Sequence, residues 1–159
     1  MTMDLFQDAA ITEMRKATMK AARDEGGKHC PCCDQFVKVY KRSINKTMAR
    51  QLIFSWRTFG YEWFHAKDVV LGSASAGDYS KLKFWGLIEK KPHEEGYNGK
   101  KSSGYWRVTH QGARFVLFKL TVQKYALVYN NRLLEFEGDQ VNIVQCLEDR
   151  FEYNKLMER

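Results

Sequence analysis

The sequence lacks the features that mark membrane and secreted proteins. No uncharged apolar run approaches the roughly 18 to 20 residues needed to cross a bilayer, which excludes an integral membrane protein. The first residues include Asp4 and Asp8 and have no basic flank before an apolar stretch, so they do not have the pattern of a secretory signal. We therefore expect a cytoplasmic protein, in which the four cysteines stay reduced.

Motifs of the common enzyme classes are also missing. The chain has no phosphate-binding glycine-rich loop, no G-x-S-x-G elbow and no HExxH sequence. Its neighbouring carboxylates, Glu94 with Glu95 and Glu135 with Glu137, fit solvated acidic patches better than a general acid and base. The sequence predicts a protein that is not an enzyme.

The composition nevertheless allows a well-packed core. Hydrophobic residues make up 44% of the 159 residues and aromatic residues 14%, with only two prolines. This differs from the low-hydrophobicity, high-charge composition of disordered proteins. The length suits one globular domain with appendages.

Positive charge is concentrated in the middle of the chain. The formal net charge is +7, but residues 28–119 alone hold 17 Lys and Arg against 7 Asp and Glu, a net charge of +10. A localised positive field attracts phosphates and releases their counterions. The distribution indicates a polyanion partner, with solubility alone as the alternative explanation.

The first 43 residues divide into a helix and a cysteine-rich turn. Residues 4–24 contain no glycine or proline and place apolar residues three or four positions apart, which predicts an amphipathic helix within a first segment, 1–27. Gly26 and Gly27 end this helix. The second segment, 28–43, contains a His-Cys-Pro-Cys-Cys knuckle that leads into a short strand.

Cys30 and Cys33 have the C-x2-C spacing with which two thiolates bind one tetrahedral Zn²⁺. His29 or Cys32 is a candidate further ligand. The sequence has no second C-x2-C, so a four-ligand site requires a second subunit or a distant residue, which would be His65, His93, His110 or Cys146. A reduced turn without metal, with Cys146 as a small buried hydrophobe, and a thiol-redox turn remain alternatives.

Residues 44–118 alternate between helices and strands. A helix is predicted from Lys46 to Phe59, with Asn45 as its N-cap and Gly60 as its stop. The elements expected after it are helices at 66–71 and 79–85, strands at 87–91 and 105–109 around a polar loop, and a helix that Thr109 caps. Ser75 or Asp78 can cap the second short helix, which would bury Leu82 and Trp85. The last helix would bury Ala113, Val116 and Leu117.

This order of elements resembles the winged helix-turn-helix domain over residues 44–118. The most telling residues are Tyr-Ser-Lys-Leu-Lys-Phe-Trp-Gly-Leu-Ile at 79–88 and Tyr-Trp-Arg-Val-Thr-His-Gln-Gly at 105–112. They are similar to the helix, strand, wing and Thr-x-x-Gly cap of regulators of the multiple-antibiotic-resistance (MarR) type. The whole chain also resembles small uncharacterised bacteriophage proteins that carry a Cys-Pro-x-Cys knuckle before such a domain.

The last segment, 119–159, is expected to add a β-hairpin and a helix. Strands at 121–129 and 132–137 flank the turn Asn130-Asn131, and Gly138 is expected to end the second strand. Asn142 can cap a helix that runs through Phe151. The predicted fold class is α+β: a winged helix-turn-helix core with an N-terminal helix and Cys knuckle and a C-terminal hairpin plus helix. Additions of this kind commonly dimerise or dock, so we expect a homodimer.

The resemblance implies a DNA-binding surface. Residues 78–85 would form the recognition helix and residues 92–103 the wing. The implied contacts to base edges or phosphates come from Ser80, Lys81 and Lys83 in the helix and from Lys91, Lys100, Lys101 and His93 in and beside the wing. Because this helix lacks Arg, Asn and Gln, which make bidentate base contacts, we expect indirect readout or weak specificity.

The main hypothesis is therefore a non-enzymatic, double-stranded-DNA-binding transcriptional regulator of a phage or bacterium, in the host cytoplasm if phage-encoded. The alternative is a phage-type inhibitor or adaptor that binds a host protein through the winged helix and an aromatic surface including Trp63, Trp85 and Trp106. Salt dependence distinguishes the two, because phosphate binding weakens steeply with salt and an aromatic contact does not.

Overall fold

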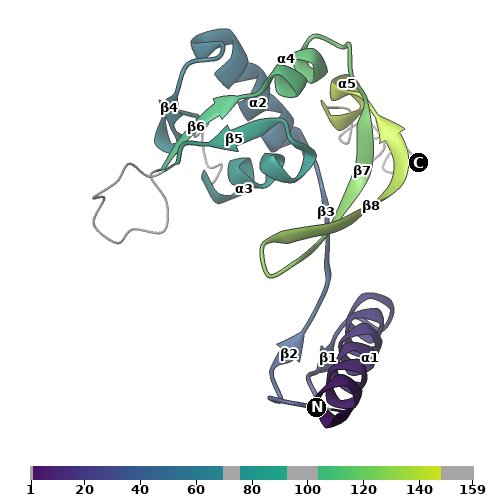
Figure 1. Ribbon diagram of the computed structural model, residues 1–159. Coiled ribbons are helices and arrows are strands. Elements are labelled where there is room, and N and C mark those ends of the chain that lie inside the picture. The colour runs from purple at the N-terminus through teal and green to yellow at the C-terminus, as the bar shows by residue number, and fades with distance from the viewer. Residues whose placement is uncertain (1, 70–75, 93–103, 148–159) are drawn as a thin grey trace, which may run out of the picture. The chain divides into compact units, whose positions relative to one another are not determined.

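The computed structural model describes residues 2–69, 76–92 and 104–147, which form a mixed α+β structure (Figure 1). Contacts divide the chain into two compact units. The first unit consists of residues 1–42 and 127–135, and the second of residues 43–126 and 136–159. None of the helices in the described ranges combines the length and apolarity that crossing a bilayer requires.

The first unit packs a long helix against short strands. Its elements are α1 (Thr2–Asp24), β1 (Lys28–His29), β2 (Phe36–Val37) and most of β3 (Tyr40–Ser43). A small apolar core joins them, formed by Ala22, Val37, Val39 and Leu127. The predicted helix at 4–24 is confirmed, and the strand predicted after the cysteines is present as β2 and β3, which are separated by two residues.

The second unit contains most of the helices. Its elements are α2 (Lys46–Phe59), β4 (Phe64–His65), the 3-10 helix η1 (Ala66–Val69), α3 (Ala76–Ser80), the 3-10 helix η2 (Lys81–Trp85), β5 (Ile88–Lys90), β6 (Tyr105–Val108), α4 (His110–Val116) and α5 (Ile143–Leu147). It also holds most of the hairpin β7 (Val122–Tyr129) and β8 (Arg132–Val141), whose tip belongs to the first unit. α2 packs against α3, α4, α5 and β6, so it is the central helix of this unit.

The three strands β4, β5 and β6 form an antiparallel sheet in the order β4-β6-β5 (Figure 1). Phe64 of β4 lies opposite Trp106 of β6, and Ile88 of β5 lies opposite Val108 of β6. The strands predicted at 87–91 and 105–109 are thus confirmed, one or two residues shorter than expected. The loop predicted between them lies, over residues 93–103, outside the described residues.

The bounds predicted for α2 are also confirmed. The Asn45 side-chain oxygen accepts the Met48 N–H at 2.8 Å, and the Gly60 N–H donates to the Trp56 carbonyl. The buried face of α2 ends with Ser55, whose hydroxyl lies 3.0 Å from the buried Tyr79 hydroxyl. This contact fixes α3 against α2.

The predicted helix at 79–85 is wrong in its type and its start. α3 begins at Ala76, and residues 81–85 continue as the 3-10 helix η2. A 3-10 helix has three residues per turn, so residues three positions apart share one face. This winding buries both Leu82 and Trp85, as predicted, and the Trp85 indole donates to the Gln123 carbonyl at 2.8 Å. The helix predicted at 66–71 is likewise a 3-10 helix over its described part.

The buried face predicted for α4 is partly wrong. Gly112, Ala113 and Phe115 are buried, whereas Leu117 is 51% exposed. The reason is that α4 packs closely on the sheet, where the Thr109 hydroxyl donates to the Gly86 carbonyl. The same hydroxyl accepts the Gly112 N–H, so Thr109 caps the helix as predicted. This anchoring directs Phe115 rather than Leu117 into the core.

The C-terminal hairpin has the predicted turn but a longer second strand. Asn130 and Asn131 have φ values of 48° and 61°, the left-handed pair of a two-residue hairpin turn. β8 does not end at Gly138 but continues to Val141. Gly138 has a φ of 88°, and a Cβ there would lie 2.8 Å from the Tyr125 ring, so glycine lets the strand pass this ring.

Asn142 caps α5 as predicted, but residues beyond 147 lie outside the described ranges.

Substitution of Gly112 tests the seating of α4. An added Cβ would lie 2.0 Å from the Leu87 carbonyl oxygen, so the helix must move away from the strand. We expect Gly112→Ala to lower the free energy of unfolding by about 2 to 3 kcal/mol, as overpacked sites do, in urea denaturation. Arg114→Ala, at an exposed position of the same helix, is the control and should change it by less than about 0.5 kcal/mol. Equal stability of Gly112→Ala and the native protein would contradict this packing.

Candidate functional site

Two of the predicted recognition-helix residues have partners within the protein. The Ser80 hydroxyl donates to the Gly77 carbonyl at 2.7 Å. The Lys81 ammonium lies 2.8 Å from the Asp78 carboxylate, with 31% of the Lys81 side chain exposed. A ligand that contacts Lys81 must therefore displace or share Asp78. A partly exposed ion pair contributes little stability, so a phosphate can compete for Lys81.

Lys83 lies on η2 in a different setting. Its ammonium is 5.3 Å from the centroid of the Phe84 ring, and its side chain is half-buried. Burial, and then the positive charge of Lys90, lower the pKa of Lys83. The ammonium groups of Lys83 and Lys90 therefore repel each other across the surface that η2 and β5 share.

The remaining predicted cations belong to the wing. Lys91 follows β5, with its ammonium 5.8 Å from the centroid of the Tyr105 ring. Lys100 and Lys101, like His93, lie outside the described residues. Arg107, the cation of β6, pairs with Glu89 and covers the Trp63 ring at 4.4 Å. Lys90 was not predicted as a phosphate contact. Its position beside Lys91 at the end of a strand was the sequence signal that could have identified it.

A short hairpin holds the cysteine turn, which we define as residues 30–33. Lys28 lies opposite Val37 and His29 opposite Phe36. Beyond these strands the Cys30 N–H donates to the Gln35 carbonyl at 2.8 Å, and the Asp34 N–H donates to the Cys30 carbonyl at 2.9 Å. These hydrogen bonds hold the backbone at both ends of the turn.

Hydrogen bonds within this turn act on the Cys30 thiol. Hydrogen bonds from the backbone N–H groups of Cys32 and Cys33, and then from the Cys33 thiol, lower the pKa of Cys30. Cys32 and Cys33 are exposed. The Cys33 thiol is thus a hydrogen-bond donor to Cys30, the other member of the C-x2-C pair, while the binding of a metal by this pair stays a prediction.

The other predicted metal ligands that the structure describes have their own settings within each unit. In the described part of the chain, no three His, Cys, Asp or Glu side chains form a group that would hold a metal ion. His29 instead uses Nδ1 to donate to the Asp34 carbonyl at 2.9 Å, which leaves Nε2 as its metal-binding nitrogen when the ring is neutral. In the second unit, His65 Nδ1 accepts the Lys67 N–H, His110 Nδ1 lies 3.3 Å from the Tyr61 hydroxyl, and Cys146 is buried.

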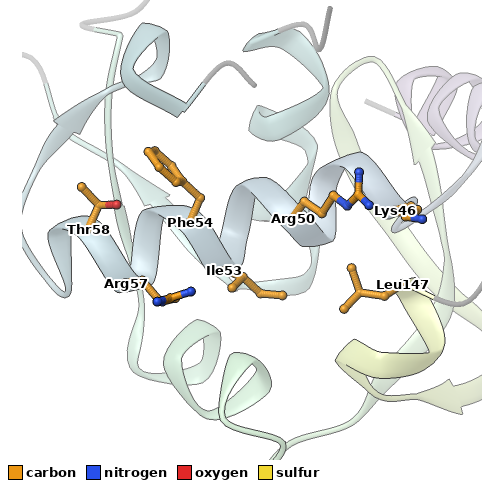
Figure 2. A pocket seen from close by; sticks show the side chains of 7 residues that line it. All are labelled: Lys46, Arg50, Ile53, Phe54, Arg57, Thr58 and Leu147. Carbon is orange, nitrogen blue, oxygen red and sulfur yellow. The ribbon is translucent and has the colours of Figure 1, made fainter. Parts of the chain in front are cut away.

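A basic hollow of about 720 Å³ lies along α2 in the second unit. Figure 2 shows Lys46 and Arg50 toward one end of α2, Arg57 toward the other, and Ile53 between them facing Leu147 of α5. Phe54 and Thr58 complete the lining. These cations were not predicted as a site, although their spacing of four and seven residues places them along one side of the helix. The hollow suits a ligand with both acidic and apolar groups.

No protein-family model matches the chain, and no curated protein or solved structure shows significant similarity to it.

The hydrogen bonds to Cys30 predict an unusually acidic thiol. Since they favour the thiolate, alkylation of Cys30 by iodoacetamide should reach half its maximal rate at a lower pH in the folded protein than in the unfolded chain. Mass spectrometry of fragment ions resolves the three neighbouring cysteines, and protein in guanidinium chloride is the control. An equal or higher midpoint in the folded protein would contradict the hydrogen-bonded turn.

Proposed function

We propose that this protein is a non-enzymatic, DNA-binding regulator that contacts duplex phosphates through η2, β5 and the segment that follows β5. The observation that carries the proposal is the electrostatic repulsion between Lys83 of η2 and Lys90 of β5, which, after burial, lowers the pKa of Lys83. A phosphate bound between them would relieve this repulsion. The net charge of +10 over residues 28–119 would add long-range attraction to the same polyanion.

The topology of the second unit supports a winged-helix interpretation. The order α2, β4, η1, α3–η2, β5, β6 is that of the winged helix-turn-helix domain, and the sheet order β4-β6-β5 places the strand after the wing between the other two. In such a domain the helix before β5 enters the major groove and the wing contacts the neighbouring backbone. Lys83, Lys90 and Lys91 would then lie on one DNA-facing side. A fold by itself does not determine function, so the charges carry the proposal.

The same residues favour weak sequence specificity. Ser80 and Lys81 have partners inside the protein, and the helix offers no Arg, Asn or Gln for bidentate contacts to bases. Phosphate contacts fix the position of a protein on DNA but carry no sequence information. The proposed regulator would therefore select its sites through DNA shape or through a second bound molecule.

Removal of Lys83 and Lys90 tests the DNA proposal. We expect Lys83→Ala combined with Lys90→Ala to weaken binding to random-sequence duplex DNA by about tenfold at moderate salt, and to reduce the slope of log affinity against log salt by about 1 to 2. Fluorescence anisotropy at several salt concentrations measures both. The matched control is Lys67→Ala with Lys119→Ala, which removes two exposed lysines of the same unit. An unchanged affinity and slope in the Lys83–Lys90 variant would refute the proposed contact.

The basic hollow favours a second function, a contact with another protein. The aromatic surface that the sequence suggested does not carry it, because Trp85 and Trp106 are only 5% and 6% exposed and Arg107 covers Trp63. These rings are largely core residues. The hollow instead combines Lys46, Arg50 and Arg57 with apolar side chains, which suits an acidic amphipathic segment of a partner.

A designed peptide separates the two functions. A synthetic helical peptide with Glu and Leu on one face should bind the native protein, and Arg50→Ala with Arg57→Ala should weaken this binding about tenfold or more because two charge contacts are lost. The Lys83–Lys90 variant serves as the control and should bind the peptide normally. Equal peptide affinity in the native protein and the Arg50–Arg57 variant would rule out the hollow as this binding site.

A further inference from the structure

We propose that the cysteine turn is half of a Zn²⁺ site, which a second copy of the chain completes. Cys30 and Cys33 of each copy would supply the four thiolate ligands of one tetrahedral ion. This inference concerns the first unit alone and does not depend on the proposed DNA contact.

The geometry of the turn suits two of the four ligands. The hairpin register and the two hydrogen bonds between Cys30 and residues 34–35 fix the backbone on both sides of the C-x2-C sequence. The backbone N–H groups of Cys32 and Cys33 donate to the Cys30 sulfur. Donors of this kind stabilise a metal-bound thiolate from outside the ligand shell. The backbone on both sides of the C-x2-C sequence is therefore held in place before any metal binds.

The number of ligands favours a second chain. A closed structural zinc site has four ligands. His29 and the three cysteines of the turn are the first unit's only residues with an imidazole or thiol group. In the described part of the chain no three metal-binding side chains converge. Two ligands from each of two copies give the required four, and the exposed Cys33 leaves the pair open to a neighbour.

Charge favours the same arrangement. Residues 28–42 carry four Lys and Arg against one Asp, so two copies that meet here would repel each other. One Zn²⁺ bound by four thiolates has a net charge of −2, which would offset part of this positive charge. Metal binding would therefore link the two copies and reduce the repulsion between their positive charges.

An apolar pocket continues from the turn and would be covered by the second copy. It has a volume of about 560 Å³, and Cys30, Pro31 and Cys32 form one side of it. Its other side includes Ile11 and Met14 of α1, which are 42% and 40% exposed. A second copy held at the cysteines would remove these side chains from water, which adds apolar burial to the metal bond.

The experiment uses the full chain, kept reduced with a phosphine and freed of metal by chelation. On addition of Zn²⁺ we expect a monomer to become a dimer in light scattering, with one ion bound per two chains. Co²⁺ should give the visible absorption of a tetrahedral tetrathiolate site, again at one ion per two chains. Cys33→Ser should abolish both changes. Cys32→Ser is the matched control in the same turn and should retain both.

Three results would overturn the proposal. The first is one ion per chain on a monomer, which would mean that a single chain completes the site. The second is no uptake of either metal by the native protein. The third is loss of binding in Cys32→Ser but not in Cys33→Ser, which would exclude the C-x2-C pair. Circular dichroism of each variant checks that the hairpin and α1 stay folded.

Discussion

The seating of α4 on the strand that follows η2 is the constraint on which the second unit depends. Thr109 joins the two parts: its N–H donates to the Leu87 carbonyl and its hydroxyl to the Gly86 carbonyl, while the hydroxyl also caps α4. The missing side chain of Gly112 allows this approach. Gly86, with a φ of 69°, turns the chain from η2 into β5 at the same point. This junction connects η2, which carries Lys83, to β5, which carries Lys90.

The two units offer different chemistry. The second presents cations on η2 and β5 and a separate basic hollow along α2, both suited to anionic partners. The first presents a rigid turn of thiols beside an apolar pocket. A regulator that binds a repeating polyanion gains affinity when two copies are joined, because the second contact becomes intramolecular. Metal-linked dimerisation in the first unit and phosphate contact in the second would therefore reinforce each other while remaining separately testable.

Local patterns predicted the elements well, and packing accounts for what they missed. Asn45, Thr109 and Asn142 cap helices as expected because a cap depends on neighbouring residues alone. The 3-10 winding of η2, the inward turn of Phe115 and the passage of β8 beyond Gly138 each result from contacts with residues distant in sequence. The candidate site shows the same division. The sequence identified the candidate lysines, but the Asp78–Lys81 pair and the effect of the Lys90 charge on Lys83 require the folded arrangement.

The central claim is that duplex phosphates contact the protein at Lys83 and Lys90. Nuclear magnetic resonance of ¹⁵N-labelled protein, titrated with a short random-sequence duplex at low salt, tests it most directly. The account predicts the largest amide shifts in η2 and β5, with reversal on addition of salt. Shifts confined to α2 around Arg50 and Arg57, or no shifts in the second unit, would contradict it.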